Sequence, residues 1–305
     1  MATMQRALLA GLGLSWIGAC GEVQELNLDA AATSNAPLRC NPAASFGAAT
    51  ALTSLNTTAD DERADLSSDE LTLYFSSSRP GGVGGFDIYK ATRTSITAAF
   101  GNITPVAGMN TTVDERGPRV TADGLSMLVY SRVPGATAQH IMQATRTTAA
   151  LPFSGLQVIA KVDGTTDDVD PYLLQNGNVI YFTSNRGGNY GLYRSSKTGG
   201  AFSIPTLVSG VNLDTASIEN SPVVTPDELT LYFSSDRPGG SGSLDIYVVT
   251  RPTTADGFGA PTALTSLNTA SVDTPSWISP DGCALYFSRA EPNLGFQLYV
   301  AMRGR

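Results

Sequence analysis

Short apolar runs, separated by turn residues, recur along the whole chain, and the clearest of them carry large side chains at consecutive positions. These runs are Leu71–Ser76, Val179–Thr183, Leu229–Ser234 and Ala284–Ser288. A strand with one face in water would alternate apolar and polar residues, whereas these runs place aromatic and aliphatic residues on both faces. The pattern therefore predicts short strands that are buried between neighbouring sheets.

The runs belong to a unit that occurs five times. Each unit opens on Phe-Gly or Phe-Ser, at Phe46, Phe100, Phe153, Phe202 and Phe258, so the starts are 54, 53, 49 and 56 residues apart. Each contains an apolar run ending in Asn or Asp, an extended segment that starts with an acidic residue, a tight turn, the apolar strand, and a last strand ending in Arg or Lys. Four short strands with a period near 50 are typical of a propeller blade.

We therefore predict an all-β fold, a five-bladed β-propeller over residues 46–305 with four short antiparallel strands per blade. The repeats span about 46–99, 100–152, 153–201, 202–257 and 258–305. The first unit begins with the strand expected at Leu52–Asn56, and the last unit lacks a strand after Leu298-Tyr299. The N-terminal strand is expected to complete the last blade and close the ring, which removes exposed sheet edges.

The N-terminus has the pattern of an export signal. Residues 1–6 form a short basic region that ends in Arg6, residues 7–19 are apolar but too short to span a bilayer, and small residues precede Cys20. Ile17-Gly18-Ala19-Cys20 resembles the lipobox of bacterial lipoproteins, in which the cysteine is acylated and becomes the first residue. The resemblance implies a signal peptide over 1–19, a lipidated N-terminus and tether over 20–45, and an outer-membrane address, because Gly21 and not Asp follows the cysteine. The alternative is an ordinary secretory signal.

Cysteine usage then bears on the fold. With Cys20 assigned to lipid, Cys40 and Cys283 remain as one pair in an oxidising compartment. A disulfide between them would fasten the first segment to the last blade. Two separate thiols are the alternative.

The repeats also resemble a known family, the WD40-like PD40 repeats of TolB-type β-propellers. The residues that carry the resemblance are Pro280-Asp281-Gly282, Pro226-Asp227, Phe233–Arg237 and Asp245-Ile246-Tyr247. TolB has six blades and an additional N-terminal domain, whereas five repeats and no such domain are found here. The resemblance implies the fold and an envelope location more strongly than a role in the Tol system, because propellers host many activities.

Composition and charge exclude several classes of function. A formal net charge of −8 argues against nucleic-acid binding, which needs clustered Lys and Arg. His140 is the only histidine, so sites built on several histidines are excluded. It stands where two other repeats have Asp87 and Asp245. No cofactor is expected; a calcium ion in the channel is weakly supported, because the spacing of Asp163, Asp167, Asp168 and Asp170 does not fit an EF-hand.

Two sets of charged residues recur in every repeat. Acidic residues begin the channel-lining strand, at Asp61 or Glu62, Glu115, Asp168, Glu219 and Asp273. They would either ring one channel mouth and receive a cation or a basic partner, or cap turns and pair with arginines. Arginines follow the apolar strand, at Arg79, Arg132, Arg186, Arg237 and Arg289. We expect these to be structural, paired with carboxylates such as Asp87 and Asp245 or with carbonyls.

Two classes of function follow. The first is a non-enzymatic envelope lipoprotein, monomeric and held to the membrane by lipid alone, whose acidic mouth binds a protein, peptidoglycan or carbohydrate. The second is a glycoside hydrolase resembling five-bladed arabinanases, which use channel carboxylates and need no histidine. Such enzymes use non-equivalent acids from different blades, whereas the acids here are repeated. We therefore favour the binding module, without catalytic residues.

Overall fold

The computed structural model describes residues 39–133, 135–212 and 217–305, and these residues form strands and loops without an α-helix. Consequently, none of the described segments is a helix with the length and apolar character required to cross a bilayer. The expected signal peptide, Cys20 and most of the tether lie outside the described residues. Everything below concerns the described part of the chain.

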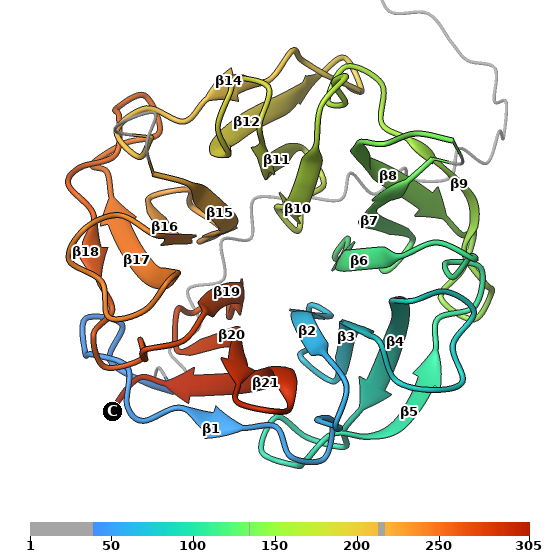
Figure 1. Ribbon diagram of the computed structural model, residues 1–305, viewed down its shortest axis with the longest axis horizontal. Helices are drawn as coiled ribbons and strands as arrows, with labels where there is room; N and C mark the ends of the chain where they lie inside the picture. Colours follow the sequence, from blue (N-terminus) through green and yellow to red (C-terminus); the bar gives the residue numbers. More distant parts are fainter. Residues whose placement is uncertain (1–38, 134, 213–216) are drawn as a thin grey trace, which may run out of the picture. The chain divides into compact units, whose positions relative to one another are not determined.

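Five small antiparallel sheets form the five blades of a β-propeller, which confirms the predicted fold (Figure 1). The first blade contains β2 (Asp61–Leu66), β3 (Thr72–Ser77), β4 (Asp87–Thr92) and β5 (Gly101–Pro105), and the second contains β6 (Glu115–Val120), β7 (Ser126–Arg132), β8 (Gln139–Thr145) and β9 (Ser154–Val158). The third contains β10 (Asp168–Leu173), β11 (Val179–Ser184), β12 (Gly191–Thr198) and β14 (Thr206–Leu207), with the short β13 (Ala201–Phe202) paired to the end of β12. The fourth contains β15 (Glu219–Val224), β16 (Thr230–Ser235), β17 (Asp245–Thr250) and β18 (Thr262–Ala263).

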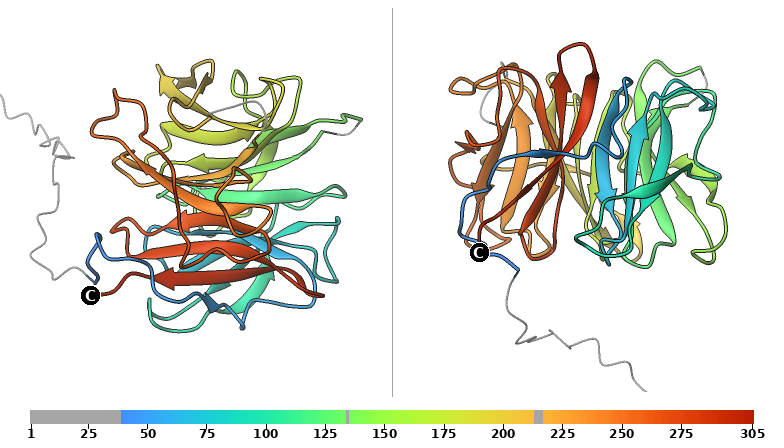
Figure 2. Two further views of the ribbon diagram at one scale, coloured as in Figure 1. Left: turned by 60° about the vertical axis from the view of Figure 1, so that its left-hand side comes forward. Right: turned by 90° about the horizontal axis from the view of Figure 1, so that it is seen from below.

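The fifth blade closes the ring with both ends of the propeller. It contains β19 (Asp273–Ile278), β20 (Ala284–Glu291), β21 (Gly295–Met302) and the N-terminal β1 (Thr50–Ala51). Thr50 pairs with Val300, Phe46 forms a further bridge with Arg303, and β1 lies along β21 in Figure 2. Cys40 and Cys283 form a disulfide, as expected. The N-terminal segment is therefore fastened to the last blade by both a strand and a covalent bond.

One expectation about the outer strand is wrong. The run Leu52–Asn56 forms a turn, and the outer strand is the shorter Thr50–Ala51 before it. Asn56 donates from Nδ2 to the carbonyl of Leu298 (3.0 Å) and accepts from the Leu298 N–H at Oδ1 (2.8 Å). A side-chain amide can donate from its NH₂ group and accept at its carbonyl oxygen, so it takes the place of a strand residue in the hydrogen-bond ladder. The asparagines at equivalent places are Asn110, Asn212 and Asn268. Each makes the same pair of hydrogen bonds with the backbone N–H and carbonyl of one residue in the third strand of its blade.

The second strand of each blade is buried on both faces, as the apolar runs predict. Phe75, Phe182, Phe233 and Phe287 are all fully buried. Each lies about 6 Å, centroid to centroid, from a tyrosine of the third strand: the separations are 6.0, 6.0, 6.0 and 5.5 Å. The hydrophobic core thus consists of layers between blades, arranged around the central channel.

Candidate functional site

The five repeated acids begin the innermost strands β2, β6, β10, β15 and β19, and all are buried. Asp61, Glu115, Asp168, Glu219 and Asp273 are exposed by at most 1%. Four of the carboxylates accept a hydrogen bond from a backbone N–H of the loop that enters the strand: Asp61 from Thr57 (2.6 Å), Glu115 from Thr111 (2.9 Å), Asp168 from Gly164 (2.6 Å) and Asp273 from Thr269 (2.7 Å). These four acids therefore tie an incoming loop to the start of the blade.

Four of these acids pair with arginines of their own blade. The nitrogen–oxygen distances are 2.6 Å for Arg79–Asp61, 2.5 Å for Arg186–Asp168, 2.9 Å for Arg237–Glu219 and 2.7 Å for Arg289–Asp273. Each guanidinium also donates to a carbonyl of the loop and lies over aromatic rings of strands two and three. Asp87 and Asp245, the partners expected from the sequence, instead accept from backbone N–H groups of their hairpins. The pairs therefore lie within blades and hold strand, loop and hairpin together.

The second blade departs from this arrangement. Arg132 is exposed, and Val133 occupies the position that corresponds to Arg79. Glu115 accepts hydrogen bonds from the Thr111 N–H (2.9 Å) and the Thr111 hydroxyl, and burial raises the pKa of its carboxyl. Glu115 is therefore the one repeated acid without an arginine partner among the described residues.

A β-bulge in each innermost strand directs another set of side chains to the channel. The third residue of four strands has a positive φ, at Arg63 (60°), Gly117 (61°), Asp170 (50°) and Ser221 (54°). Positive φ is unfavourable for residues with a Cβ, so this bulge must be held by its surroundings. The Arg63 N–H donates to Ser288 Oγ of the preceding blade at 3.0 Å, and the Ser221 N–H donates to Thr183 Oγ1 at 3.1 Å.

The bulge residues of three blades meet across the channel. Arg63 Nη1 lies 2.9 Å from Asp170 Oδ1, and Ser221 Oγ donates to Asp170 Oδ2 at 3.1 Å. Arg63 also donates to the Ser221 hydroxyl. Blades one, three and four are thereby joined at the centre of the ring, where β2, β10 and β15 face one another (Figure 1).

Two further ion pairs line the channel. Arg116 Nη1 lies 3.2 Å from Glu62 Oε1, and Arg119 Nη1 lies 3.1 Å from Asp65 Oδ1. Burial raises the pKa of both carboxyls, and the two guanidinium groups oppose that shift. The Arg116 side chain remains 30% exposed, whereas Glu62 is almost fully buried. Arg116 is therefore the most exposed side chain of this network, ahead of Arg63 at 17%.

The opposite end of the channel is narrow. Leu66, Val120, Leu174, Val224 and Ile278, one from each blade, line it together with the polar side chains of Asp65 and Gln175, and its cavity measures about 20 Å³. A cavity of this size holds about one water molecule. The channel thus has a polar mouth at one end and a narrow cavity at the other.

His140 pairs with Asp163. Its Nδ1 lies 2.8 Å from Asp163 Oδ1, and both side chains are largely buried. Asp163 occupies the place that an asparagine has in the other turns, so both partners depart from the repeat. Asp167 accepts hydrogen bonds from Gln139 and Tyr190, Asp168 pairs with Arg186, and Asp170 with Arg63. Across the described ranges, no group of three or more His, Cys, Asp and Glu residues is placed to hold a metal ion.

Sequence reasoning found the repeated acids and arginines but missed the network that faces the channel. Arg63, Asp65, Arg116 and Arg119 carry this network together with Glu62 and Asp170. They stand at positions where the five repeats differ, and a comparison of those positions within strand one would have singled them out.

Comparison with known proteins shows the fold. None of the protein-family models compared with the chain matches it, and none of the curated protein sequences does. TolB from Acinetobacter baumannii superposes with a TM-score of 0.52 and 17% identity, over 81% of this chain and 56% of that one. This chain thus spans little more than half the length of that structure. The endo-arabinase from Bacteroides thetaiotaomicron VPI-5482 superposes with a TM-score of 0.54 and 13% identity, over 86% of this chain and 98% of that one.

Proposed function

We propose that this chain is an exported, lipid-anchored β-propeller that acts as a non-enzymatic binding module of the bacterial cell envelope. Export through residues 1–19 and anchoring through Cys20 rest on the sequence pattern. The TolB-like fold and the Cys40–Cys283 disulfide agree with an oxidising, extracytoplasmic compartment. The partner is an envelope protein, peptidoglycan or another carbohydrate.

The observation that carries this proposal is the pairing of the channel carboxylates. A glycosidase needs two carboxyl groups about 5 to 10 Å apart, placed on either side of a cleft that admits the sugar. Here Glu62, Asp65 and Asp170 each have a guanidinium nitrogen within 3.2 Å. Carboxylates held in this way build the channel wall, which favours binding over hydrolysis.

The polar mouth is the surface we assign to the partner. Arg116 is 30% exposed and its neighbour Asp114 is 52% exposed, so the mouth presents charges of both signs. Arg116 has no counterpart in the other blades, whereas Asp114 corresponds to Asp60 and Asp167. Four of the five buried acids are already paired with arginines. A partner would therefore meet Arg116 and Asp114 before any of the repeated carboxylates.

The test is capture of partners from envelope extracts by the mature lipoprotein purified from membranes. We expect a partner that is lost with Arg116→Gln and Asp114→Asn combined and retained with the control Asp69→Asn, an exposed carboxylate in the turn at the other end of the first blade. Circular dichroism establishes that the variants remain folded. Equal capture by both variants would contradict the assignment of the mouth. Hydrolysis of arabinan or peptidoglycan by the purified protein, absent from Glu62→Gln, would contradict the non-enzymatic function.

A further inference from the structure

Four of the five junctions between neighbouring blades share an arginine–tyrosine contact, and the junction of the second and third blades does not. At four junctions an arginine at the end of the third strand faces a tyrosine in the second strand of the preceding blade: Arg93–Tyr286, Arg146–Tyr74, Arg251–Tyr181 and Arg303–Tyr232. At the junction of the second and third blades the corresponding residues are Leu128 and Lys197. Both members of the pair have changed, so this junction lacks the hydrogen bond that the others have.

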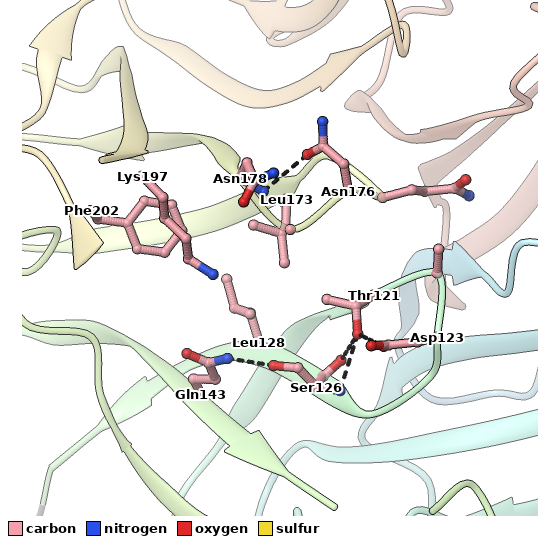
Figure 3. Close-up of a pocket in the computed structure, with 13 residues that line it drawn as sticks. Thr121, Asp123, Ser126, Leu128, Gln143, Leu173, Asn176, Asn178, Lys197 and Phe202 are labelled. Atoms are coloured by element: carbon pink, nitrogen blue, oxygen red, sulfur yellow. Dashed lines mark hydrogen bonds between the residues drawn. The ribbon is translucent and has the colours of Figure 1, made fainter. Parts of the chain in front are cut away.

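A pocket of about 360 Å³ lies at this junction (Figure 3). Its apolar wall is formed by Leu128, Leu173 and Phe202, and its polar wall by residues of both blades. The polar lining consists of Thr121, Asp123, Ser126, Gln143, Gln175, Asn176, Asn178 and Lys197. The rim is fixed by a backbone bond from the Ala122 N–H to the Gln175 carbonyl (3.2 Å). The pocket lies at the turns that end β6 and β10, away from the polar mouth where these strands begin.

Lys197 supplies a positive charge to this pocket. Its Nζ lies 4.9 Å from the centroid of the Phe202 ring, and no carboxylate of the described chain lies within ion-pair distance of it. Figure 3 shows the ammonium group directed into the space that Leu128 borders. Asp123 accepts from the Thr121 hydroxyl (2.6 Å) and from the Leu125 N–H (2.9 Å), so it is engaged within its own turn.

A second pocket lies at a junction that has the arginine and tyrosine, and it serves for comparison. It measures about 430 Å³ and lies at the junction of the fourth and fifth blades. There Arg303 donates to the Tyr232 hydroxyl (2.9 Å), to the carbonyl of Gly282 (2.9 Å) and to the carbonyl of Ala44. Its donors are used within the protein, whereas the ammonium of Lys197 remains available to a ligand.

We infer that the pocket between the second and third blades binds an acidic sugar, a saccharide that carries a carboxylate. Lys197 would pair with the carboxylate. Gln143 Nε2 already donates to the Ser126 hydroxyl, and Asn176 Oδ1 accepts from the Asn178 N–H (2.9 Å). Gln143 Oε1, Asn176 Nδ2 and the Asn178 amide are the groups offered to sugar hydroxyls. Leu128 and Leu173 provide an apolar wall for the C–H groups of the ring. The volume is within the range of about 300 to 1,000 Å³ that small-molecule sites have. This site is separate from the polar mouth and does not depend on the proposed function.

Calorimetric titration of the full mature protein with glucuronate tests the inference. We expect saturable binding with a dissociation constant of about 1 mM or lower, and weaker binding of the uncharged match, glucose. Lys197→Gln should weaken glucuronate binding at least about tenfold, because a charge-assisted hydrogen bond is lost. The double variant Leu128→Tyr/Lys197→Arg rebuilds the junction found four times in this fold, so it should remain folded and lose binding.

The decisive controls use the second pocket and a second anion. Thr230→Gln narrows the pocket at the fourth and fifth blades and should leave glucuronate binding unchanged. Absence of binding to the unaltered protein, or equal binding by Lys197→Gln, would overturn the site. Inorganic phosphate that binds as tightly as glucuronate would overturn the assignment to a sugar.

Discussion

Asp61 and Glu115 occupy the same position in neighbouring blades but have different partners. Asp61 faces Arg79 at 2.6 Å, whereas Glu115 is held by Thr111 alone among the described residues. Removing the counter-charge of a buried ion destabilises a protein strongly. Replacing a buried acid that has no arginine partner, and whose pKa burial raises, should cost less. The two positions therefore allow a matched comparison.

We expect Asp61→Asn to lower the free energy of unfolding by about 2 to 4 kcal/mol, because the amide leaves Arg79 without its counter-charge. Glu115→Gln should change it by less than about 1 kcal/mol, because the amide retains the shape and can accept from Thr111. Urea unfolding of both variants at neutral pH measures the difference. Equal losses would show that the arginine contributes nothing specific at Asp61.

The raised pKa of Glu115 gives stability a pH dependence of known sign. The folded protein keeps this proton at pH values where the unfolded chain, with an ordinary pKa of 4.5, has lost it. The stability that the group contributes is therefore present below about pH 4.5 and declines as the pH rises toward the folded value. Glu115→Gln should gain stability relative to the unaltered protein between pH 4 and 7, as followed by urea unfolding. A constant difference across this range would contradict the shift.

Arg63 shows why the channel network escaped prediction from sequence. Aligning the five repeats identifies residues that occur in all of them, and the five buried acids were found in this way. Arg63 reaches Asp170 only because a bulge places it at φ 60°. Glycine is the usual sequence signal for a positive φ, and this position has arginine instead. The partner lies on another blade, 107 positions further along the chain, and no spacing rule connects the two.

At the scale of elements, the turn at Leu52–Asn56 shows a side chain taking the place of a strand. The apolar spacing of this run, and of its near copy at Leu264–Asn268, predicts a strand. The turns that form instead keep their leucines buried or half-buried, as a strand would. The outer strands are only two residues long in three of the five blades, and Asn side chains extend the ladder beyond them. Pattern alone did not separate a short strand followed by such a turn from a longer strand.

Asn56→Ala should destabilise the protein by about 2 kcal/mol, because both the N–H and the carbonyl of Leu298 lose a partner. Ser54→Ala, at an exposed position of the same turn, is the control and should stay within about 0.5 kcal/mol. Thermal unfolding compares them. A loss no larger than that of the control would show that water replaces the amide.

At the scale of the whole molecule, the sequence was sufficient for the number of blades, the order of strands and the closure of the ring. These follow from the repeat count and from the incomplete units at the two ends. The blade junctions were not predicted, because Leu128 and Lys197 become informative only after the tyrosines and arginines of the other junctions are seen to meet. The absence of an arginine–tyrosine pair at one junction can be recognised only after the pairs at the other four junctions are known.

The disulfide should contribute strongly to stability, because Cys40 and Cys283 are 243 positions apart. In the chain-entropy model, a cross-link over so long a loop stabilises the protein by about 5.5 kcal/mol. Cys40→Ser/Cys283→Ser should therefore unfold at a clearly lower urea concentration than the unaltered protein. The same double variant should be insensitive to dithiothreitol, whereas the unaltered protein should approach it when reduced. Coincident unfolding curves for oxidised and reduced protein would indicate that the β1 strand alone keeps the ring closed.

The closure of the fifth blade also determines what a protease would produce. Gly199-Gly200, between β12 and β13, is exposed. Cleavage between them in the proposed mature chain, residues 20–305, would give two polypeptides of 180 and 106 residues. Both would remain linked through Cys40 and Cys283, and new ends would open in the third blade while the original ends stay joined. A nicked molecule would thus have new chain ends in the third blade, as a circular permutant does, and would migrate as one species without reductant and as two with it.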